Sequence, residues 1–114
     1  MSVIPVLRMF DVEATKDFYC NFVGMNVDWQ HQHEENFPLY LQVSLGDNVI
    51  HVSEHYGDCA PGARIRIGLE NLEDWYGNLN KNYRFARPGM ENGPTGKEVT
   101  IGDPNFNTLI FYQK

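Results

Sequence analysis

The stretch Val43-Ser44-Leu45-Gly46-Asp47 has a near copy, Val99-Thr100-Ile101-Gly102-Asp103, which begins 56 positions further along the 114-residue chain. Each copy is followed by a run that is typical of a strand, residues 48–53 and 108–112, and the first is also preceded by one, residues 38–42. A Gly-Asp pair favours a turn between two such strands, so the sequence predicts two hairpins. The repeat indicates that the chain consists of two similar modules.

Each half also contains a predicted helix before its hairpin. Residues 12–23 place apolar side chains three or four positions apart, begin after Asp11, a suitable N-cap, and end at Gly24. The second predicted helix begins at Asn71 and has the same apolar spacing. The other predicted strands are residues 3–7, 25–30, 65–69 and about 83–87.

This order of elements predicts an α+β fold made of two βαβββ modules that form a curled mixed sheet. We expect one domain, residues 1–114, with modules at about 1–60 and 61–114. The segment Pro61-Gly62 marks the boundary, and residues 88–94 interrupt the periodicity a second time. A half of this size cannot hold a stable core alone, so the halves must pair, within one chain or between two chains.

The charge balance limits the classes of partner. The net charge is −6, which argues against nucleic acid or an anionic membrane. Residues 1–60 carry a net −7, which favours a cationic ligand, although acidic surface also keeps a protein soluble. We expect a cytoplasmic protein, because a secretory leader and a long apolar run are missing. Cys20 and Cys59 suggest reduced thiols rather than a disulfide or zinc site.

Strand alternation predicts two faces with different chemistry. Aliphatic side chains share one face and should pack on the helices, while polar, aromatic and charged side chains share the other. The polar face is either the wet side of a helix-backed sheet or, if the sheets curl together, the wall of a small-molecule cleft. Its candidate ligand contacts are Tyr40, Gln42, His51, Ser53, Arg64 and Glu98.

Several segments together identify a family. They are Ile4-Pro5-Val6-Leu7-Arg8 with Asp11, Asp17-Phe18-Tyr19, Phe22-Val23-Gly24-Met25 and Asp103-Pro104-Asn105-Phe106-Asn107. With them the chain resembles the vicinal oxygen chelate (glyoxalase/bleomycin resistance/dioxygenase) superfamily. The segments that resemble its bleomycin-resistance branch are residues 53–58, residues 83–89 and Gly96-Lys97-Glu98. The resemblance implies paired βαβββ modules, a homodimer, and a ligand groove lined partly by each subunit.

The resemblance also allows a check on metal binding. Enzymes of the superfamily hold a divalent metal with His or Glu from the first, fourth, fifth and eighth strands, which correspond here to Ile4, His51, Arg64 and Ile110. One histidine cannot hold a catalytic ion alone, so we expect no metal of this type, no cofactor and no catalytic residue. His31 and His33 could share a strand face and bind metal elsewhere, although exposed polar residues are the simpler interpretation.

The resemblance implies antibiotic resistance by sequestration of a bleomycin-type drug without chemical turnover. Such drugs are cationic and carry a flat aromatic tail, which Phe37, Tyr40 and Tyr56 could contact. A tryptophan commonly found before the Gly of the seventh strand is replaced here by Thr95. Two alternatives remain open: a metal-dependent lyase or dioxygenase with relocated ligands, and a descendant of the fold that binds another small ligand.

Overall fold

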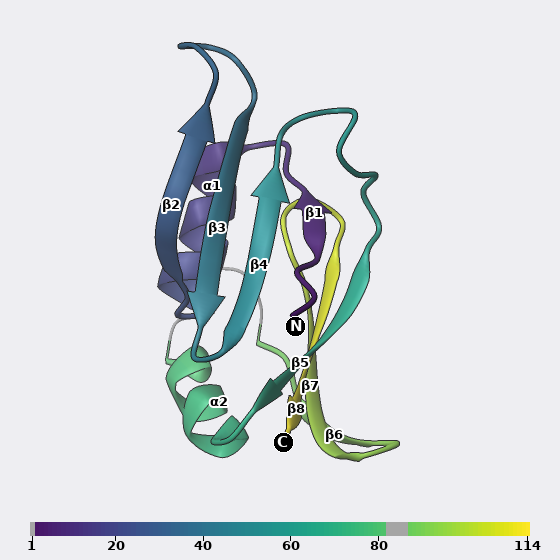
Figure 1. Cartoon of the computed structure of the whole chain (residues 1–114). Coiled ribbons are helices and arrows are strands. Elements are labelled where there is room, and N and C mark those ends of the chain that lie inside the picture. Colours follow the sequence, from purple (N-terminus) through teal and green to yellow (C-terminus); the bar gives the residue numbers. More distant parts are fainter. Residues whose placement is uncertain (1, 82–86) are drawn as a thin grey trace.

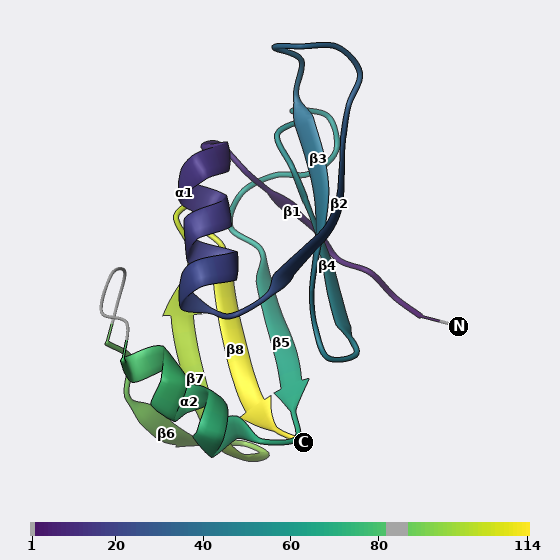
Figure 2. The ribbon, with the colours of Figure 1, turned by 90° about the vertical axis from the view of Figure 1, so that its left-hand side faces the viewer.

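A computed structural model describes residues 2–81 and 87–114, which form two four-stranded mixed sheets and two helical segments (Figure 1). Figure 2 shows both helical segments on one side of the molecule and the first sheet, nearly edge-on, on the other. The elements in chain order are β1 (Val6–Arg8), α1 (Val12–Lys16), η1 (Asp17–Phe22), β2 (Asn26–Gln32), β3 (Leu39–Leu45), β4 (Asn48–Ser53), β5 (Arg64–Leu69), α2 (Leu72–Asn80), β6 (Met90–Gly93), β7 (Gly96–Gly102) and β8 (Thr108–Gln113).

The two sheets have the same topology, which confirms the predicted pair of βαβββ modules. The strand order is β1-β4-β3-β2 in the first sheet and β5-β8-β7-β6 in the second. In each sheet the first and last strands of the module pair in parallel, and the other neighbours are antiparallel. Gly46 and Asp47 form the predicted two-residue turn between β3 and β4, and Gly46 has a φ of 59°. The corresponding connection between β7 and β8 is longer and begins at Asp103.

The first helix begins and ends where the sequence predicts. The carboxylate of Asp11 accepts a hydrogen bond from the backbone N–H of Ala14, as an N-cap should. The helix continues from α1 into η1, a π-helical segment in which the N–H of Val23 donates to the carbonyl of Phe18, five residues back. Gly24, with a φ of 93°, then ends it in a conformation that only glycine adopts readily.

One hydrophobic core joins the two halves of the chain. It contains Phe18 and Tyr19 from the first helix, the inward side chains of both sheets, and Leu72 and Leu79 from α2. The indole N–H of Trp75 on α2 donates to the carbonyl of Val23 (2.8 Å), and the Trp75 ring packs on Phe111 of β8. The two modules therefore pack against each other within one chain. None of the helices in the described part of the chain has the length and apolarity needed to span a bilayer.

A buried polar cluster around Asp103 connects the same two halves. The carboxylate of Asp103 accepts hydrogen bonds from the hydroxyl of Tyr19 (2.6 Å), the backbone N–H groups of Asn105 and Asn107, and the Asn107 side chain. Asn105 in turn donates to the hydroxyl of Thr15 on α1. The start of the β7–β8 connection is thereby fixed to the first helix.

One segment differs from its prediction. Residues 88–94 contain strand β6, Met90–Gly93, which pairs with β7 from Met90 opposite Val99 to Gly93 opposite Gly96. A strand thus forms where the sequence shows only a break in periodicity, because cross-strand pairing overrides the low strand propensity of glycine and proline. The strand expected at about residues 83–87 falls almost wholly outside the described residues.

Candidate functional site

A group of three rings lies on the open face of the first sheet, with Trp29 exposed and Tyr40 and His51 half-buried, and we call these residues the aromatic cluster. Trp29 on β2 and Tyr40 on β3 are nearly parallel, with ring centroids 6.0 Å apart and an interplanar angle of 9°. His51 on β4 stands edge-on to both, with its centroid 5.2 Å from that of Trp29 and 5.1 Å from that of Tyr40. Trp29 is 43% exposed, so the cluster presents ring surface to a ligand.

A β-bulge in β2 places Trp29 in this cluster. The pairing of β2 with β3 joins Val27 to Val43 and next Trp29 to Gln42, so Asp28 is an extra residue. In a regular strand Trp29 would share the face of Val27 and point toward the core side. The bulge turns Trp29 to the polar face, on which the Asp28 carboxylate already lies by regular alternation. Alternation along the sequence carries no signal of the extra residue, so Trp29 was not predicted as a site residue; Asp28 was not singled out either, although alternation places it on the polar face.

A chain of hydrogen bonds connects Asp28 to the rings. The side-chain amide of Gln42 donates to the carboxylate of Asp28 (3.0 Å), and the Ser44 hydroxyl also donates to it (3.0 Å). The Gln42 Oε1 lies 2.9 Å from Nε2 of His51, and Nδ1 of His51 lies 2.6 Å from the Tyr40 hydroxyl. Partial burial lowers the pKa of His51, which favours the neutral ring, and it raises the pKa of Tyr40. The structure thus brings Tyr40, Gln42 and His51 together, as the sequence predicts.

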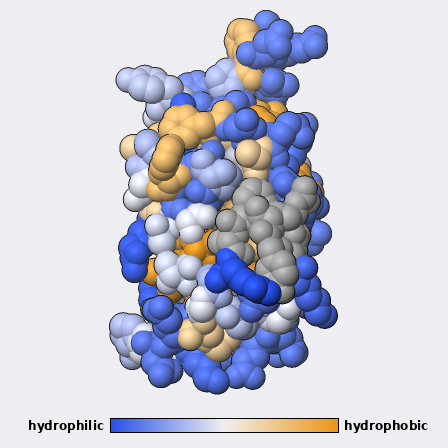
Figure 3. Space-filling view, turned by 180° about the vertical axis from the view of Figure 1, so that it is seen from behind, coloured by the Kyte–Doolittle hydropathy of each residue, from blue (hydrophilic) through white to orange (hydrophobic). Residues whose placement is uncertain are grey.

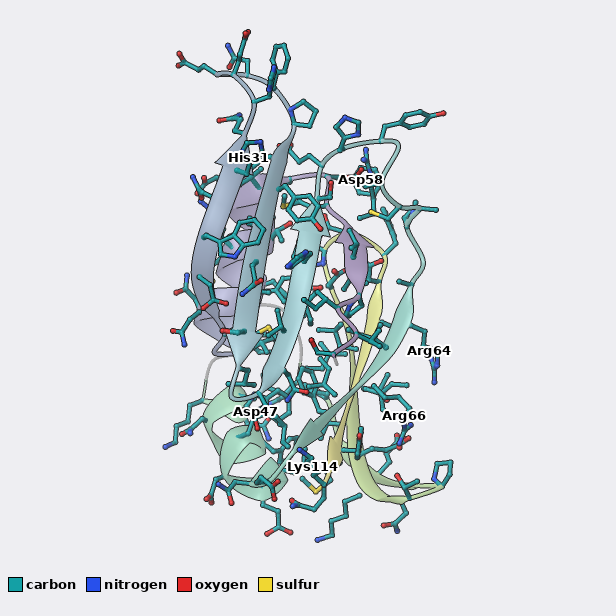
Figure 4. The ribbon with its side chains drawn as sticks, in the orientation of Figure 1. His31, Asp47, Asp58, Arg64, Arg66 and Lys114 are labelled. Atoms are coloured by element: carbon teal, nitrogen blue, oxygen red, sulfur yellow. The ribbon has the colours of Figure 1, made fainter. Side chains whose placement is uncertain are left out.

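A mostly apolar hollow of about 350 Å³ adjoins the cluster at the end of the sheet near the β2–β3 connection. Tyr40 belongs to both the cluster and this hollow, and the predicted contact Phe37 also lines it, with its ring 5.7 Å from that of His33. Its other lining residues are His31, Pro38, His55 and Asp58. Figure 4 shows His31 and Asp58 at this upper end of the first sheet. The hollow extends the open face beyond the rings.

Two other predicted contacts lie near this end of the sheet in different settings. Ser53 is fully buried, and its hydroxyl donates to the carboxylate of Asp58 (2.7 Å) and accepts from the backbone N–H of His55 (3.0 Å). Its hydroxyl therefore holds the loop that follows β4. Tyr56 lies in that loop and is 89% exposed.

Arg64 and Glu98 belong to the second sheet, and the structure does not bring them to the aromatic cluster. Figure 4 shows Arg64 and Arg66 extending from β5 away from the first sheet. Glu98 pairs with Arg66 (3.4 Å), whose guanidinium also donates to Thr95 (3.1 Å) and lies 4.9 Å from the centroid of the Tyr112 ring. Thr95 therefore supports an arginine side chain. Arg66 has the same alternation as Arg64 in β5, so the sequence alone does not distinguish the two.

The residues at the superfamily's metal positions do not fit a metal ion. Ile4, Arg64 and Ile110 offer no lone pair for coordination. His51 has both ring nitrogens within hydrogen-bond distance of side chains, so neither is available to a metal without loss of a contact. Across residues 2–81 and 87–114, His, Cys, Asp and Glu side chains form no group of three suited to hold an ion, and this includes His31 and His33.

The helix side of the molecule offers a different surface. Figure 3 shows it from behind, with a largely hydrophilic margin and scattered apolar groups, most of them in the upper half. The exposed aromatic residues Phe10 and Phe106 contact each other edge-on, with centroids 6.2 Å apart. Trp75 lies partly buried against Phe111 and packs on the core.

Comparison with solved structures supports the fold. A bleomycin-binding protein in complex with bleomycin superposes with a TM-score of 0.75 and 18% identity, over 100% of this chain and 98% of that chain. A glyoxalase/bleomycin resistance protein from Streptomyces sp. CB03234 gives a TM-score of 0.75 and 20% identity, over 96% and 97% of the two chains. The bleomycin-binding protein of Streptomyces verticillus, solved with copper(II)-bleomycin, gives a TM-score of 0.67 and 21% identity, over 100% and 96%.

Comparison of sequences gives the family. No curated protein sequence matches this chain significantly. The profile described as "Glyoxalase superfamily protein" matches residues 1–114. The matched region includes both βαβββ modules, so the chain belongs to the glyoxalase superfamily.

Proposed function

We propose that this protein binds a cationic aromatic small molecule of the bleomycin type and sequesters it without chemical turnover. The observation that carries the proposal is the nearly parallel pair of the exposed Trp29 and the half-buried Tyr40 on a polar sheet face. Aromatic rings placed this way stack on flat ligands. The net −7 of residues 1–60 attracts a positive charge to the same module. Structures of the same fold that are titled bleomycin-binding proteins support this choice of ligand.

The proposal includes a homodimer in which two chains form each ligand groove. Its support is the separation of the predicted contacts: Tyr40 and His51 lie on strands of the first sheet, whereas Arg64 and Glu98 lie on strands of the second. A second chain could complete a groove that one chain leaves open. Sedimentation equilibrium tests this part, and a protein of single-chain mass at micromolar concentration would contradict it.

Calorimetric titration with metal-free bleomycin at low salt tests the ligand. We expect saturable binding with a Kd below about 1 μM, which corresponds to roughly −8 kcal/mol. Mass spectrometry of the recovered drug should show it unchanged, because sequestration leaves the ligand intact. No heat and no saturation would refute the choice of bleomycin and direct the search to other ligands for this face.

Three variants locate the binding surface. Trp29→Ala should weaken binding roughly tenfold, because stacking contributes about 0.5–1.5 kcal/mol beyond area burial, and Trp29→Phe should retain part of it. The matched control is Phe106→Asn, which removes an exposed aromatic ring from the β7–β8 connection. Phe106 has a φ of 69°, a conformation that asparagine tolerates, so the control should fold and bind normally. Equal losses in Trp29→Ala and Phe106→Asn would place binding elsewhere.

A further inference from the structure

We propose that Asp28 orients the hydrogen-bond chain so that the Tyr40 hydroxyl oxygen faces the ligand as an acceptor only. The site therefore selects aromatic ligands that carry an N–H or ammonium donor. This inference rests on the proposed function, because it names the chemical group that the same face would recognise. It specifies that the site accepts hydrogen bonds from the ligand, in addition to attracting positive charge.

The direction is set at Asp28. An ionised carboxylate offers acceptors only, and that of Asp28 lies 3.0 Å from the Gln42 side-chain nitrogen. Gln42 must therefore turn its NH₂ group toward Asp28, which leaves its carbonyl oxygen toward His51. The second donor to Asp28, the Ser44 hydroxyl, occupies the other carboxylate oxygen and holds the side chain in place.

The direction then passes through His51 to Tyr40. The carbonyl oxygen of Gln42 lies 2.9 Å from Nε2 of His51, so Nε2 must carry the hydrogen. In a neutral imidazole the other nitrogen is then an acceptor, and Nδ1 accepts from the Tyr40 hydroxyl at 2.6 Å. Partial burial of the ring favours the neutral form that this assignment requires.

The consequence is that Tyr40 has no hydrogen left for a ligand. A phenol has one O–H, and here it is directed to His51, so only oxygen lone pairs remain. A ligand that places an amidine, amine or amide N–H beside the Tyr40 hydroxyl gains a hydrogen bond. A ligand carboxylate gains none, because both partners would be acceptors. Trp29, nearly parallel to the Tyr40 ring, supplies the surface for the ligand's aromatic part. In this scheme Tyr40 determines specificity, and Asp28 is a positioning residue that acts through Gln42 and His51.

The tautomer of His51 tests the scheme without any ligand. Long-range ¹H–¹⁵N spectra at pH 7.5 should show His51 with its hydrogen on Nε2 alone. In Asp28→Asn the Gln42 amide can rotate, so both tautomers of His51 should appear. Ser44→Ala is the matched control, because it removes a hydrogen bond to Asp28 without a change at Gln42, and it should keep the single tautomer. A hydrogen on Nδ1 in the native protein, or an unchanged tautomer in Asp28→Asn, would overturn the proposal.

Two small probes test the selectivity. Benzamidine, which at neutral pH is a cationic donor, should shift the indole resonance of Trp29 at a lower concentration than benzoate, an acceptor. High salt screens the long-range attraction of the acidic module, so the comparison is made there. Tyr40→Phe leaves the net charge unchanged but removes the acceptor, and it should reduce the preference for benzamidine roughly fivefold. An unchanged preference in Tyr40→Phe would overturn the role of Tyr40.

These results are separable from the test with bleomycin. Failure of bleomycin to bind, together with a benzamidine preference that depends on Tyr40, would refute the proposed drug and leave the donor selectivity standing. Bleomycin binding together with equal affinities for benzamidine and benzoate would refute the donor selectivity and leave the proposed function standing.

Discussion

Replacement of Tyr19 by phenylalanine should weaken the connection between the two modules. The Tyr19 side chain is fully buried, and its hydroxyl donates to the Asp103 carboxylate at 2.6 Å. Phenylalanine keeps the ring, so the change removes one hydrogen bond and leaves the packing of the ring in place. Among the residues that the structure describes, the Oδ2 atom of Asp103 then retains only the donor from the Asn107 side chain.

The expected loss follows from the charge of the acceptor. A hydrogen bond to a charged group contributes about 1.5–3 kcal/mol, so Tyr19→Phe should lower the free energy of unfolding by about 2 kcal/mol at pH 7. For a domain of this size that corresponds to a decrease in Tm of roughly 8 °C. Urea denaturation followed by circular dichroism measures the free energy, and Tyr56→Phe, at an exposed position, is the control that should show little change.

The same substitution changes the response to alkaline pH. Burial, and then the negative charge and hydrogen bond of Asp103, raise the pKa of Tyr19 well above 10.0. The unfolded tyrosine loses its proton near pH 10 while the folded one keeps it, so this contribution to stability is complete below pH 10 and decreases as the pH rises further. The native protein should therefore lose about 0.8 kcal/mol at pH 10.5 that Tyr19→Phe does not lose.

Two results would refute this reasoning. A loss below about 0.5 kcal/mol at pH 7 would mean that the hydroxyl contributes no more than an average neutral hydrogen bond. A difference between native protein and Tyr19→Phe that stays constant from pH 7 to pH 10.5 would mean that the folded and unfolded tyrosine ionise alike.

Three further predictions concern other parts of the structure. NMR titration should give His51 a pKa below 6.5, because burial disfavours the charged ring, and a value at or above 6.5 would contradict this. The contribution of the neutral His51 ring to stability is present above pH 6.5 and is lost as the pH falls. Gly68→Ala should destabilise the protein by about 1 kcal/mol in urea denaturation, because the new Cβ would lie 2.9 Å from the Tyr112 hydroxyl; a neutral result would show that the ring moves away freely. Trp75→Phe should lower the free energy of unfolding by about 2 kcal/mol, since the carbonyl of Val23 loses its 2.8 Å indole donor and the side chain loses volume. An unchanged denaturation midpoint would argue against that contact.

The topology could be predicted because it depends on a pattern that the sequence repeats. Two copies of a strand-turn-strand signal, each preceded by a helix with apolar residues three or four positions apart, determine the order of elements in both modules. Asp11 and Gly24 act through local rules of helix capping, which require no knowledge of the rest of the molecule. The resemblance to the superfamily then extended the prediction from the elements to their pairing.

The candidate site was only partly predictable, because the place of Trp29 depends on pairing between strands. The bulge at Asp28 is defined by which residues of β3 lie opposite, and strict alternation would turn Trp29 to the other face. Outside the site, strand β6 likewise exists through its partner β7 rather than through its own propensity. Tyr40, Gln42 and His51 lie together on the polar face, as alternation indicates, because β3 and β4 pair without irregularity.

The cluster around Asp103 also determines when the protein can complete its fold during synthesis. Its hydrogen bonds join Tyr19 to Asp103 and Thr15 to Asn105, pairs separated by 84 and 90 positions in the chain. The ribosome releases the first helix long before it makes these partners. The first module is therefore synthesised before the residues that complete its interface. Contacts between residues so far apart in the chain slow folding, because a long loop must close first. Residues 103–107 complete this interface, so their deletion should impair both modules rather than the second one alone.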